Sequence, residues 1–196
     1  MSKAVMLSIR PKWCEKIASG EKTVEVRKTR PKMNTPFKCY IYCTLPKYPH
    51  EDFIATNYPR PQFYGGGKVV GEFTCDRIDW ITHIGHTGIP NLVETRICNA
   101  ATMRTSPVGG LLNAACLTPK MLNDYLAGGD GYGWHISDLR IYDAPRELTE
   151  FRRSCPNDLY CEACAMYSNN NNGICNNGAL PLRRPPQSWC YVEEDT

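Results

Sequence analysis

The order of structural elements in the first 45 residues limits the fold more than any other feature of the sequence. Residues 5–9 form an apolar run typical of a strand, and Pro11 stands where a helix over residues 12–19 would begin. Gly20 is a natural residue to end that helix. Two further strand-like segments follow, at residues 23–28 and 37–45. A strand, a short helix and two strands in this order predict a mixed α+β domain.

The rest of the chain adds elements of the same kinds. Residues 68–81 predict a long strand, and a helix begins at Thr118 and ends before Gly128. Two more strands are expected at residues 134–142 and 188–192. We therefore expect a curved sheet of about five or six strands, closed into a barrel by two helices.

The length of 196 residues suits one main domain with a small appendage. We expect that domain at residues 1–153, with an insertion at 82–117 that contains one short helix. A small segment at residues 154–180 follows, and residues 181–196 return to the barrel as a tail strand.

Charge is distributed unevenly along the chain. Residues 1–38 carry ten Lys or Arg and three Glu, a net charge of +7, whereas residues 39–196 carry thirteen basic and seventeen acidic residues, a net charge of −4. This asymmetry suggests an anionic partner that is met on one face. The alternative is ordinary solvated charge.

The segment from Gly20 to Arg27 contains three charged residues that are candidates for a binding or catalytic site. Strict alternation along a strand places Glu25 and Arg27 on one face and two valines on the other, while Lys22 follows a turn that leaves its direction open. A lysine, a glutamate and an arginine that converge could hold a phosphate and orient a base. The alternative is a solvated Glu–Arg pair, which is worth only a few tenths of a kcal/mol.

These motifs resemble those of a known family. The run from Leu7 to Pro11, the helix, and the pattern Gly20-x-Lys22-x-x-Glu25-x-Arg27 resemble the signature of ASCH domains, which belong to the PUA-like superfamily of small β-barrels, and residues 131–139 resemble their closing strand. The resemblance implies a cleft around the motif and nucleic acid, mainly RNA, as ligand. The site residues that it implies are Arg10, Lys22, Glu25, Arg27 and Lys28.

Some members that the sequence resembles are amidohydrolases that deacetylate a modified cytidine with a Lys, a Thr and a Glu. Lys22 matches their lysine and is the only catalytic candidate, but Glu25 stands where they carry threonine, and their acid matches no residue of this chain. We therefore expect recognition before catalysis. A hydrolase that acts on a modified nucleoside or on RNA is kept as an alternative.

A second constellation is formed by Cys155, Cys161, Cys164 and Cys175. A Cys-x-x-Cys turn with two outlying cysteines suits tetrahedral Zn²⁺, and four thiolates leave no open position, so the expected zinc is structural. The alternative is a set of free thiols in a loop. Cys190 is a reserve ligand, although its place in the last strand favours the core.

Other candidates are weaker. His83 and His86 are better explained by a surface loop than by a metal site, and Cys39 and Cys43 by the core. Cys14 lies between two lysines on the first helix, where some thiolate character is expected. Trp189 follows two arginines, and either packs the end of the barrel or extends a nucleic-acid surface.

The eleven cysteines and the lack of a secretory signal or of a long apolar segment predict a cytoplasmic protein. A rival to RNA binding is a protein-interaction module of phage or mobile-element type, which uses the 82–117 insertion and the zinc segment. Such a module would bind and inhibit a host nucleic-acid enzyme, for example a CRISPR nuclease, as an anti-CRISPR protein does.

Overall fold

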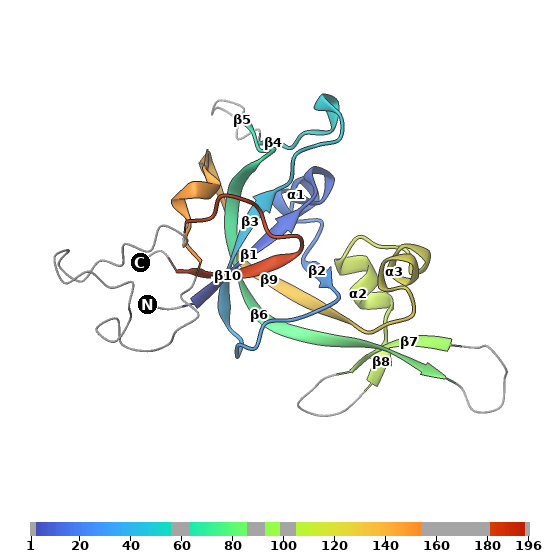
Figure 1. Ribbon diagram of the computed structural model, residues 1–196. Helices are drawn as coiled ribbons and strands as arrows, with labels where there is room; N and C mark the ends of the chain where they lie inside the picture. The colour runs from blue at the N-terminus through green and yellow to red at the C-terminus, as the bar shows by residue number, and fades with distance from the viewer. Residues whose placement is uncertain (1–2, 56–62, 86–92, 99–104, 154–180, 195–196) are drawn as a thin grey trace, which may run out of the picture.

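A computed structural model describes residues 3–55, 63–85, 93–98, 105–153 and 181–194. Its main sheet contains eight strands. Those that converge in Figure 1 are β1 (Lys3–Ile9), β2 (Val24–Arg27), β3 (Phe37–Cys43), β6 (Lys68–Gly85), β9 (Gly131–Arg146) and β10 (Trp189–Glu193). β7 (Val93–Cys98) and β8 (Thr105–Pro107) continue this sheet from β6, and β4 (Ile54–Ala55) and β5 (Phe63–Tyr64) form a separate two-stranded sheet.

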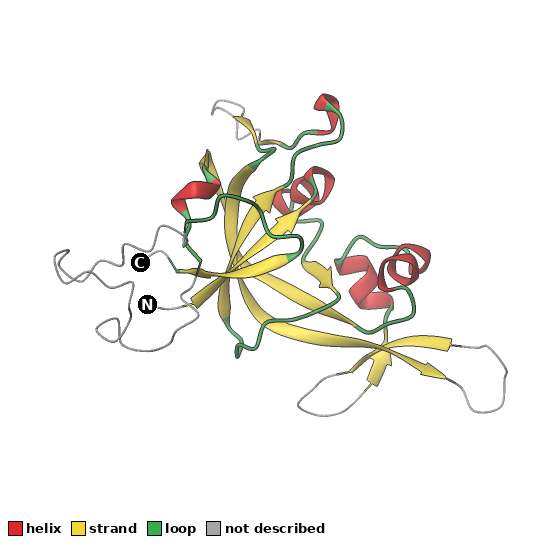
Figure 2. Cartoon of the chain, in the orientation of Figure 1, coloured by secondary structure: helices red, strands yellow, loops and turns green. Residues whose placement is uncertain are grey.

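Three α-helices lie in the described part of the chain: α1 (Pro11–Ala18), α2 (Gly109–Ala114) and α3 (Pro119–Leu126). Short 3-10 turns occupy Pro49–Glu51 and Leu148–Glu150. The start of α3 follows from its sequence, because the Thr118 hydroxyl accepts a hydrogen bond from the Met121 N–H at 3.2 Å. Figure 2 shows α2 and α3 together on one side of the sheet, apart from α1.

The strands follow the order β10–β1–β3–β6–β9–β2. The pair β1–β3 is parallel, and all other pairs in this order are antiparallel. Register shifts along β6 and β9 bend the sheet. At one of them Gly71 approaches the partner so closely that an added Cβ would lie 2.5 Å from the Arg140 carbonyl oxygen.

Side-chain bonds connect the two ends of the curved sheet. The Trp189 Nε1–H of β10 donates to the Thr29 hydroxyl just beyond β2 at 2.9 Å. The Lys32 N–H donates to the Tyr191 hydroxyl at 2.7 Å. These contacts join β10, at one end of the strand order, to the segment that follows β2, at the other end. They close the sheet into a barrel-like form.

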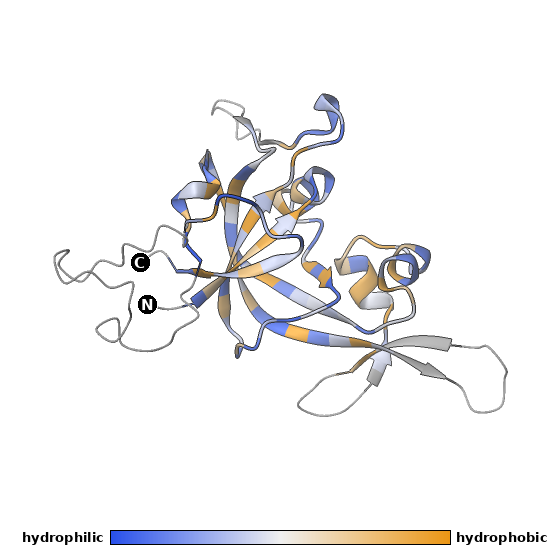
Figure 3. Cartoon of the chain, in the orientation of Figure 1, coloured by the Kyte–Doolittle hydropathy of each residue, from blue (hydrophilic) through white to orange (hydrophobic). Residues whose placement is uncertain are grey.

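The core lies on both faces of the sheet. One cluster inside the curve includes Leu7, Ile41 and Phe73 and the fully buried Trp134, and a second on the outer face includes Met6 and Tyr40 with Phe151 of the chain after β9. A third cluster packs Val24 and Val26 of β2 against leucines of α2 and α3. Figure 3 shows these apolar residues concentrated on the converging strands and on α2. β1 is buried on both faces, which explains its continuous apolar sequence.

The predicted α+β class, the strand–helix–strand order and the curved sheet with flanking helices are confirmed. β6 and β9 run several residues beyond the predicted segments. The insertion at 82–117 contains the predicted short helix, α2, and also the end of β6, β7 and β8, which form a ribbon that extends from the body (Figure 1).

Candidate functional site

The turn between α1 and β2 fixes the position of Lys22. Gly20 adopts a left-handed conformation with φ +78°, which a glycine accepts without strain, and reverses the chain after Ala18. The Lys22 N–H then donates to the Lys16 carbonyl at 2.8 Å. The lysine therefore starts from a defined position, whereas the sequence left its direction open.

β2 directs Glu25 and Arg27 to one side and Val24 and Val26 to the other. Glu25 lies opposite Trp134 in the antiparallel pairing with β9. Because residues directly opposite in a ladder share a face, the two charged side chains point to the same side as this buried tryptophan. The valines pack under α2 and α3. The alternation expected from the sequence is confirmed.

Lys22, Glu25 and Arg27 meet in one ion cluster, called here the buried triad. The Lys22 Nζ lies 3.2 Å from Glu25 Oε2, and the Arg27 Nη2 lies 3.1 Å from Glu25 Oε1. The three residues are only 3%, 7% and 7% exposed. The alternative of a solvated Glu–Arg pair is therefore wrong, because water does not screen these charges.

The buried triad also holds three parts of the fold together. The Lys22 Nζ donates to the Ala115 carbonyl, just after α2, at 2.8 Å. The Arg27 Nη2 donates to the Ser8 carbonyl of β1 at 2.8 Å, and its Nη1 reaches the Ser188 hydroxyl at 3.4 Å. The triad formally carries two positive charges and one negative. The Arg27 Nε–H has no partner within the described residues, so it can donate to one further acceptor.

Aromatic rings with cations against their faces surround the buried triad, and we call them the aromatic rim. Lys12 and Lys22 lie 4.5 and 5.0 Å from the centre of the Trp13 ring. Lys28 lies 5.4 Å from the centre of the Tyr125 ring. These are the distances of cation–π pairs.

Tyr132 completes the rim. It lies opposite Arg27 in the ladder, and Arg30 lies 5.9 Å from the centre of its ring. Burial raises the pKa of Tyr125, and the charges of Arg27 and Glu25 act on it in opposite directions, Arg27 lowering it and Glu25 raising it. Tyr125 is still 39% exposed, so the rim offers ring surface to a ligand.

The sequence predicts a basic cleft lined by Lys22, Glu25 and Arg27, with Arg10 and Lys28 adding charge. The structure brings Lys22, Glu25 and Arg27 together but buries them, whereas Arg10 and Lys28 are exposed. A ligand would therefore meet the exposed cations and the aromatic rim before the triad. The nucleic-acid role of these five residues stays a prediction.

Sequence reasoning missed the rim. The predicted site includes Lys28 but not Tyr125, Tyr132 or Arg30. One signal was available, because a cation stands at every second position after β2, at Lys28, Arg30 and Lys32.

The expectation of thiolate character at Cys14 is wrong. Burial raises the pKa of its thiol well above the usual value, the nearby Cys43 and Glu25 raise it further, and Arg27 opposes them weakly. The Cys14 thiol donates instead to the Ile9 carbonyl. Cys39 and Cys43 lie in the core, as predicted.

Trp189 packs the end of the barrel, the first of its two predicted roles. Its ring centre lies 6.0 Å from that of Trp134 and 5.4 Å from that of Tyr191. Arg183 and Arg184 are exposed. The tryptophan therefore supports the closed sheet rather than presenting a free stacking face.

The four predicted zinc ligands, Cys155, Cys161, Cys164 and Cys175, lie outside the described residues, as do the His86 residue and the His83 side chain. Elsewhere in the described chain, no group of three or more His, Cys, Asp or Glu side chains could hold a metal ion.

The fold defines the class of protein. The chain has the α+β fold of solved ASCH structures. It is similar to the crystal structure of ASCH from Zymomonas mobilis and to that of a serine-to-alanine variant of the same protein. Each is 16% identical with a TM-score of 0.52, over 97% of this chain and 88% and 89% of those chains. A tyrosine-to-phenylalanine variant matches at 18% identity, with a TM-score of 0.46, over 75% of this chain and 77% of that one.

No protein-family model matches the sequence, and a search of curated proteins finds no match. Within the described residues, none of the helices has the length and apolar character needed to span a membrane.

Proposed function

We propose that this protein binds single-stranded RNA or another unpaired nucleic acid at the aromatic rim. The observation that carries the proposal is the set of partly exposed rings, each with a cation on its face, around the buried triad. Unpaired bases stack on aromatic rings, and neighbouring cations pair with the phosphates, so this combination suits a flexible, anionic strand. The basic character of residues 1–38 supports the same partner.

Binding is favoured over turnover by the state of Lys22. A catalytic amine needs access to the substrate, but this one is 3% exposed and is held by Glu25 and the Ala115 carbonyl. A hydrolase would have to break these contacts first.

The distribution of aromatic residues favours nucleic acid over a protein partner at the insertion. Residues 82–117 contain no Phe, Trp or Tyr. Protein interfaces are typically anchored by aromatic residues. In the described residues, exposed aromatic rings lie instead at the rim and near β4 and β5, where Tyr48 and Tyr64 are found.

The RNA proposal is tested with the double variant Lys28→Ala/Tyr125→Ala. Loss of one stacking ring and one phosphate contact should weaken binding of a single-stranded RNA oligomer by roughly tenfold or more, and should lower the slope of log K against log salt by about one. Fluorescence anisotropy over a salt series measures both.

The matched control is Lys47→Ala/Tyr48→Ala, which removes another exposed cation–ring pair, 5.2 Å apart, at the Pro49–Glu51 turn. This control should bind RNA like the parent protein. Equal RNA binding by the parent and the rim variant would refute the proposal, and an equal loss in both double variants would show that binding is not localised at the rim.

We further propose a structural zinc ion bound by Cys155, Cys161, Cys164 and Cys175. The described residues on either side of the segment support it, because Arg152 pairs with Pro181 and Arg153 pairs with Val192, which brings the two flanking stretches of chain together. A short excursion with few large apolar residues gains its stability from metal binding.

Metal analysis of the purified protein should give about one zinc per chain. Cys161→Ser/Cys164→Ser should lose it, whereas Cys116→Ser, at a partly exposed cysteine of the described domain, should keep it. Zinc retained by the Cys161→Ser/Cys164→Ser variant, or a metal-free parent protein, would refute this ligand set.

A further inference from the structure

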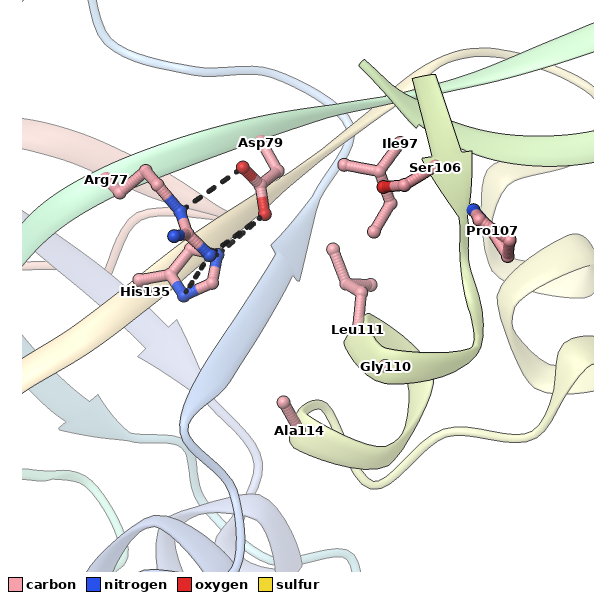
Figure 4. Close-up of a pocket in the computed structure, with 9 residues that line it drawn as sticks. All are labelled: Arg77, Asp79, Ile97, Ser106, Pro107, Gly110, Leu111, Ala114 and His135. Carbon is pink, nitrogen blue, oxygen red and sulfur yellow. Dashed lines mark hydrogen bonds and ion pairs between the residues drawn. The ribbon is translucent and has the colours of Figure 1, made fainter. Parts of the chain in front are cut away.

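A cavity of about 400 Å³ lies between the sheet and the insertion. Figure 4 shows a polar group of side chains from β6 and β9 on one wall and residues from β7, β8 and α2 on the other. The polar wall contains Arg77, Asp79 and His135, and the facing wall contains Ile97, Ser106, Pro107, Gly110, Leu111 and Ala114. Residues 82–117, the predicted insertion, thus supply every residue of the second wall.

This cavity is separate from the buried triad. Asp79 lies opposite Gly133 in the ladder between β6 and β9, and Val26 lies opposite the same glycine on the other edge of β9. Asp79 therefore shares the face of the β2 valines, and the triad residues Glu25 and Arg27 lie on the reverse face. The two sites are separated by the thickness of the sheet.

Asp79 presents an ionised acceptor inside the cavity. Its Oδ2 lies 2.8 Å from His135 Nε2, so this nitrogen carries the hydrogen and donates it. Burial alone would raise the pKa of Asp79, but the hydrogen bond and charge of His135, and then those of Arg77, outweigh burial and hold it below the usual value. The residue is 8% exposed, so its free lone pairs face the cavity or the protein rather than bulk water.

Arg77 contacts both His135 and Asp79. Its Nη2 lies 2.9 Å from His135 Nε2 and 3.3 Å from His135 Nδ1, and its contacts with the Asp79 carboxylate are longer than the shorter of these. Its Nε lies 3.3 Å from Asp79 Oδ1 and its Nη2 lies 3.5 Å from Oδ2, which are long contacts for a guanidinium and a carboxylate. The Arg77 side chain is 59% exposed. The long Arg77–Asp79 contacts leave room for a ligand to replace them on the carboxylate, and the exposed Arg77 side chain can then contact an anion outside.

The opposite wall is mainly apolar, and Ser106 is the polar side chain among the residues that line it. Leu111 is buried against the β2 valines, and Ile97 and Ala114 extend the surface beside it. Glycine at 110 adds no side chain, and an added Cβ there would meet no atom within 4 Å. A flat apolar ligand can therefore lie against this wall while its edge reaches Asp79.

We propose that this cavity binds a guanine nucleotide. The guanine base is flat, and its edge carries two adjacent N–H donors that match the two oxygens of a carboxylate. The apolar wall takes the face of the base, Asp79 accepts from its edge, and the exposed Arg77 binds the phosphate. The volume is within the range of small-ligand sites.

The nucleotide can be free or part of an RNA strand, and the two sources share this chemistry. The site goes beyond the function proposed above, because none of its residues belongs to the aromatic rim. The two proposals can therefore fail independently. The RNA proposal is tested by Lys28→Ala/Tyr125→Ala, and the nucleotide site by Asp79→Asn.

The test measures binding of guanosine, adenosine, cytidine and uridine 5′-monophosphates by titration calorimetry, together with the RNA pentamers UUGUU and UUUUU. We expect guanosine 5′-monophosphate to bind most tightly. A strand-borne guanine as the source gives preference for UUGUU over UUUUU without binding of the free nucleotide. Absence of any guanine preference, in monomers and pentamers alike, overturns the proposal.

The variant Asp79→Asn tests the pairing directly. An amide offers a donor where the carboxylate accepts, so the affinity for guanosine monophosphate should fall by about tenfold or more. Xanthosine monophosphate has a carbonyl in place of the amino group of guanine. It should therefore bind to Asp79→Asn more tightly than to the parent protein. A misfolded variant would lose binding of both nucleotides, so tighter binding of xanthosine monophosphate shows that the change in base preference comes from the altered contact. Asp76→Asn, at an exposed aspartate three positions earlier on β6, is the matched control and should behave like the parent. Unchanged base preference in Asp79→Asn overturns the proposal.

Discussion

Replacing Glu25 by alanine is expected to destabilise the protein by about 3–5 kcal/mol, because removing one member of a buried ion cluster leaves the other charges without a partner. Glu25 accepts from Lys22 on one oxygen and from Arg27 on the other, and all three residues are less than a tenth exposed. The variant would leave two like charges buried side by side. Urea unfolding, followed by circular dichroism, measures the loss as a lower midpoint.

Two further variants show whether the charge or the packing is responsible. Glu21→Ala removes an exposed carboxylate that pairs with Lys16, and should change the midpoint little. The triple variant Lys22→Met/Glu25→Leu/Arg27→Met replaces the cluster by apolar side chains of similar volume and should recover much of the stability lost by Glu25→Ala. A Glu25→Ala midpoint equal to that of Glu21→Ala would contradict the buried-cluster interpretation.

Replacing Trp134 by alanine is the second change with a large expected effect, about 3–5 kcal/mol, because it opens a cavity in a close-packed core. Trp134 is fully buried, and its ring centre lies 5.8 Å from that of Phe37 in an edge-to-face arrangement. It also supports Trp189, through which β10 contacts the segment beyond β2. Thermal and urea unfolding both report the loss.

The variant Trp134→Phe distinguishes the effect of losing the packed aromatic ring from the effect of losing the indole N–H. The indole Nε1–H has no partner among the described residues, so phenylalanine removes no hydrogen bond there and retains an aromatic ring. Its cost should be well below that of alanine. Leu45→Ala, at a side chain that is 73% exposed, is the control and should stay within about 0.5 kcal/mol of the parent. Equal losses for Trp134→Phe and Trp134→Ala would show that the indole N–H, and not the packing, matters.

Local patterns in the sequence were sufficient to predict the elements of the barrel. The alternation in β2, the proline and glycine at the two ends of α1, and the Thr118 cap of α3 each act through neighbouring residues, so one stretch of chain reveals them. The lengths of β6 and β9 were underestimated because their last residues are set by pairing with each other and with β7.

Burial of the triad was not predictable from the same patterns. The sequence shows that Lys22, Glu25 and Arg27 can converge, but their exposure depends on Ala115 and Ser8, which are distant in sequence. The cavity around Asp79 depends in the same way on the insertion packing over β6. Neither residue type nor spacing reports which distant segment will cover a strand face.

The pairing of β1 with β10 sets the order in which the chain can complete its fold. β1 is buried on both faces and lies between β3 and β10, with Leu7 opposite Trp189. One edge of this apolar strand therefore stays open until residues near 190 have been synthesised. An unpaired apolar edge is a site of intermolecular strand pairing, and closing a contact over so long a loop is slow. During synthesis, β1 is therefore protected from such pairing only after β10 has emerged and paired with it.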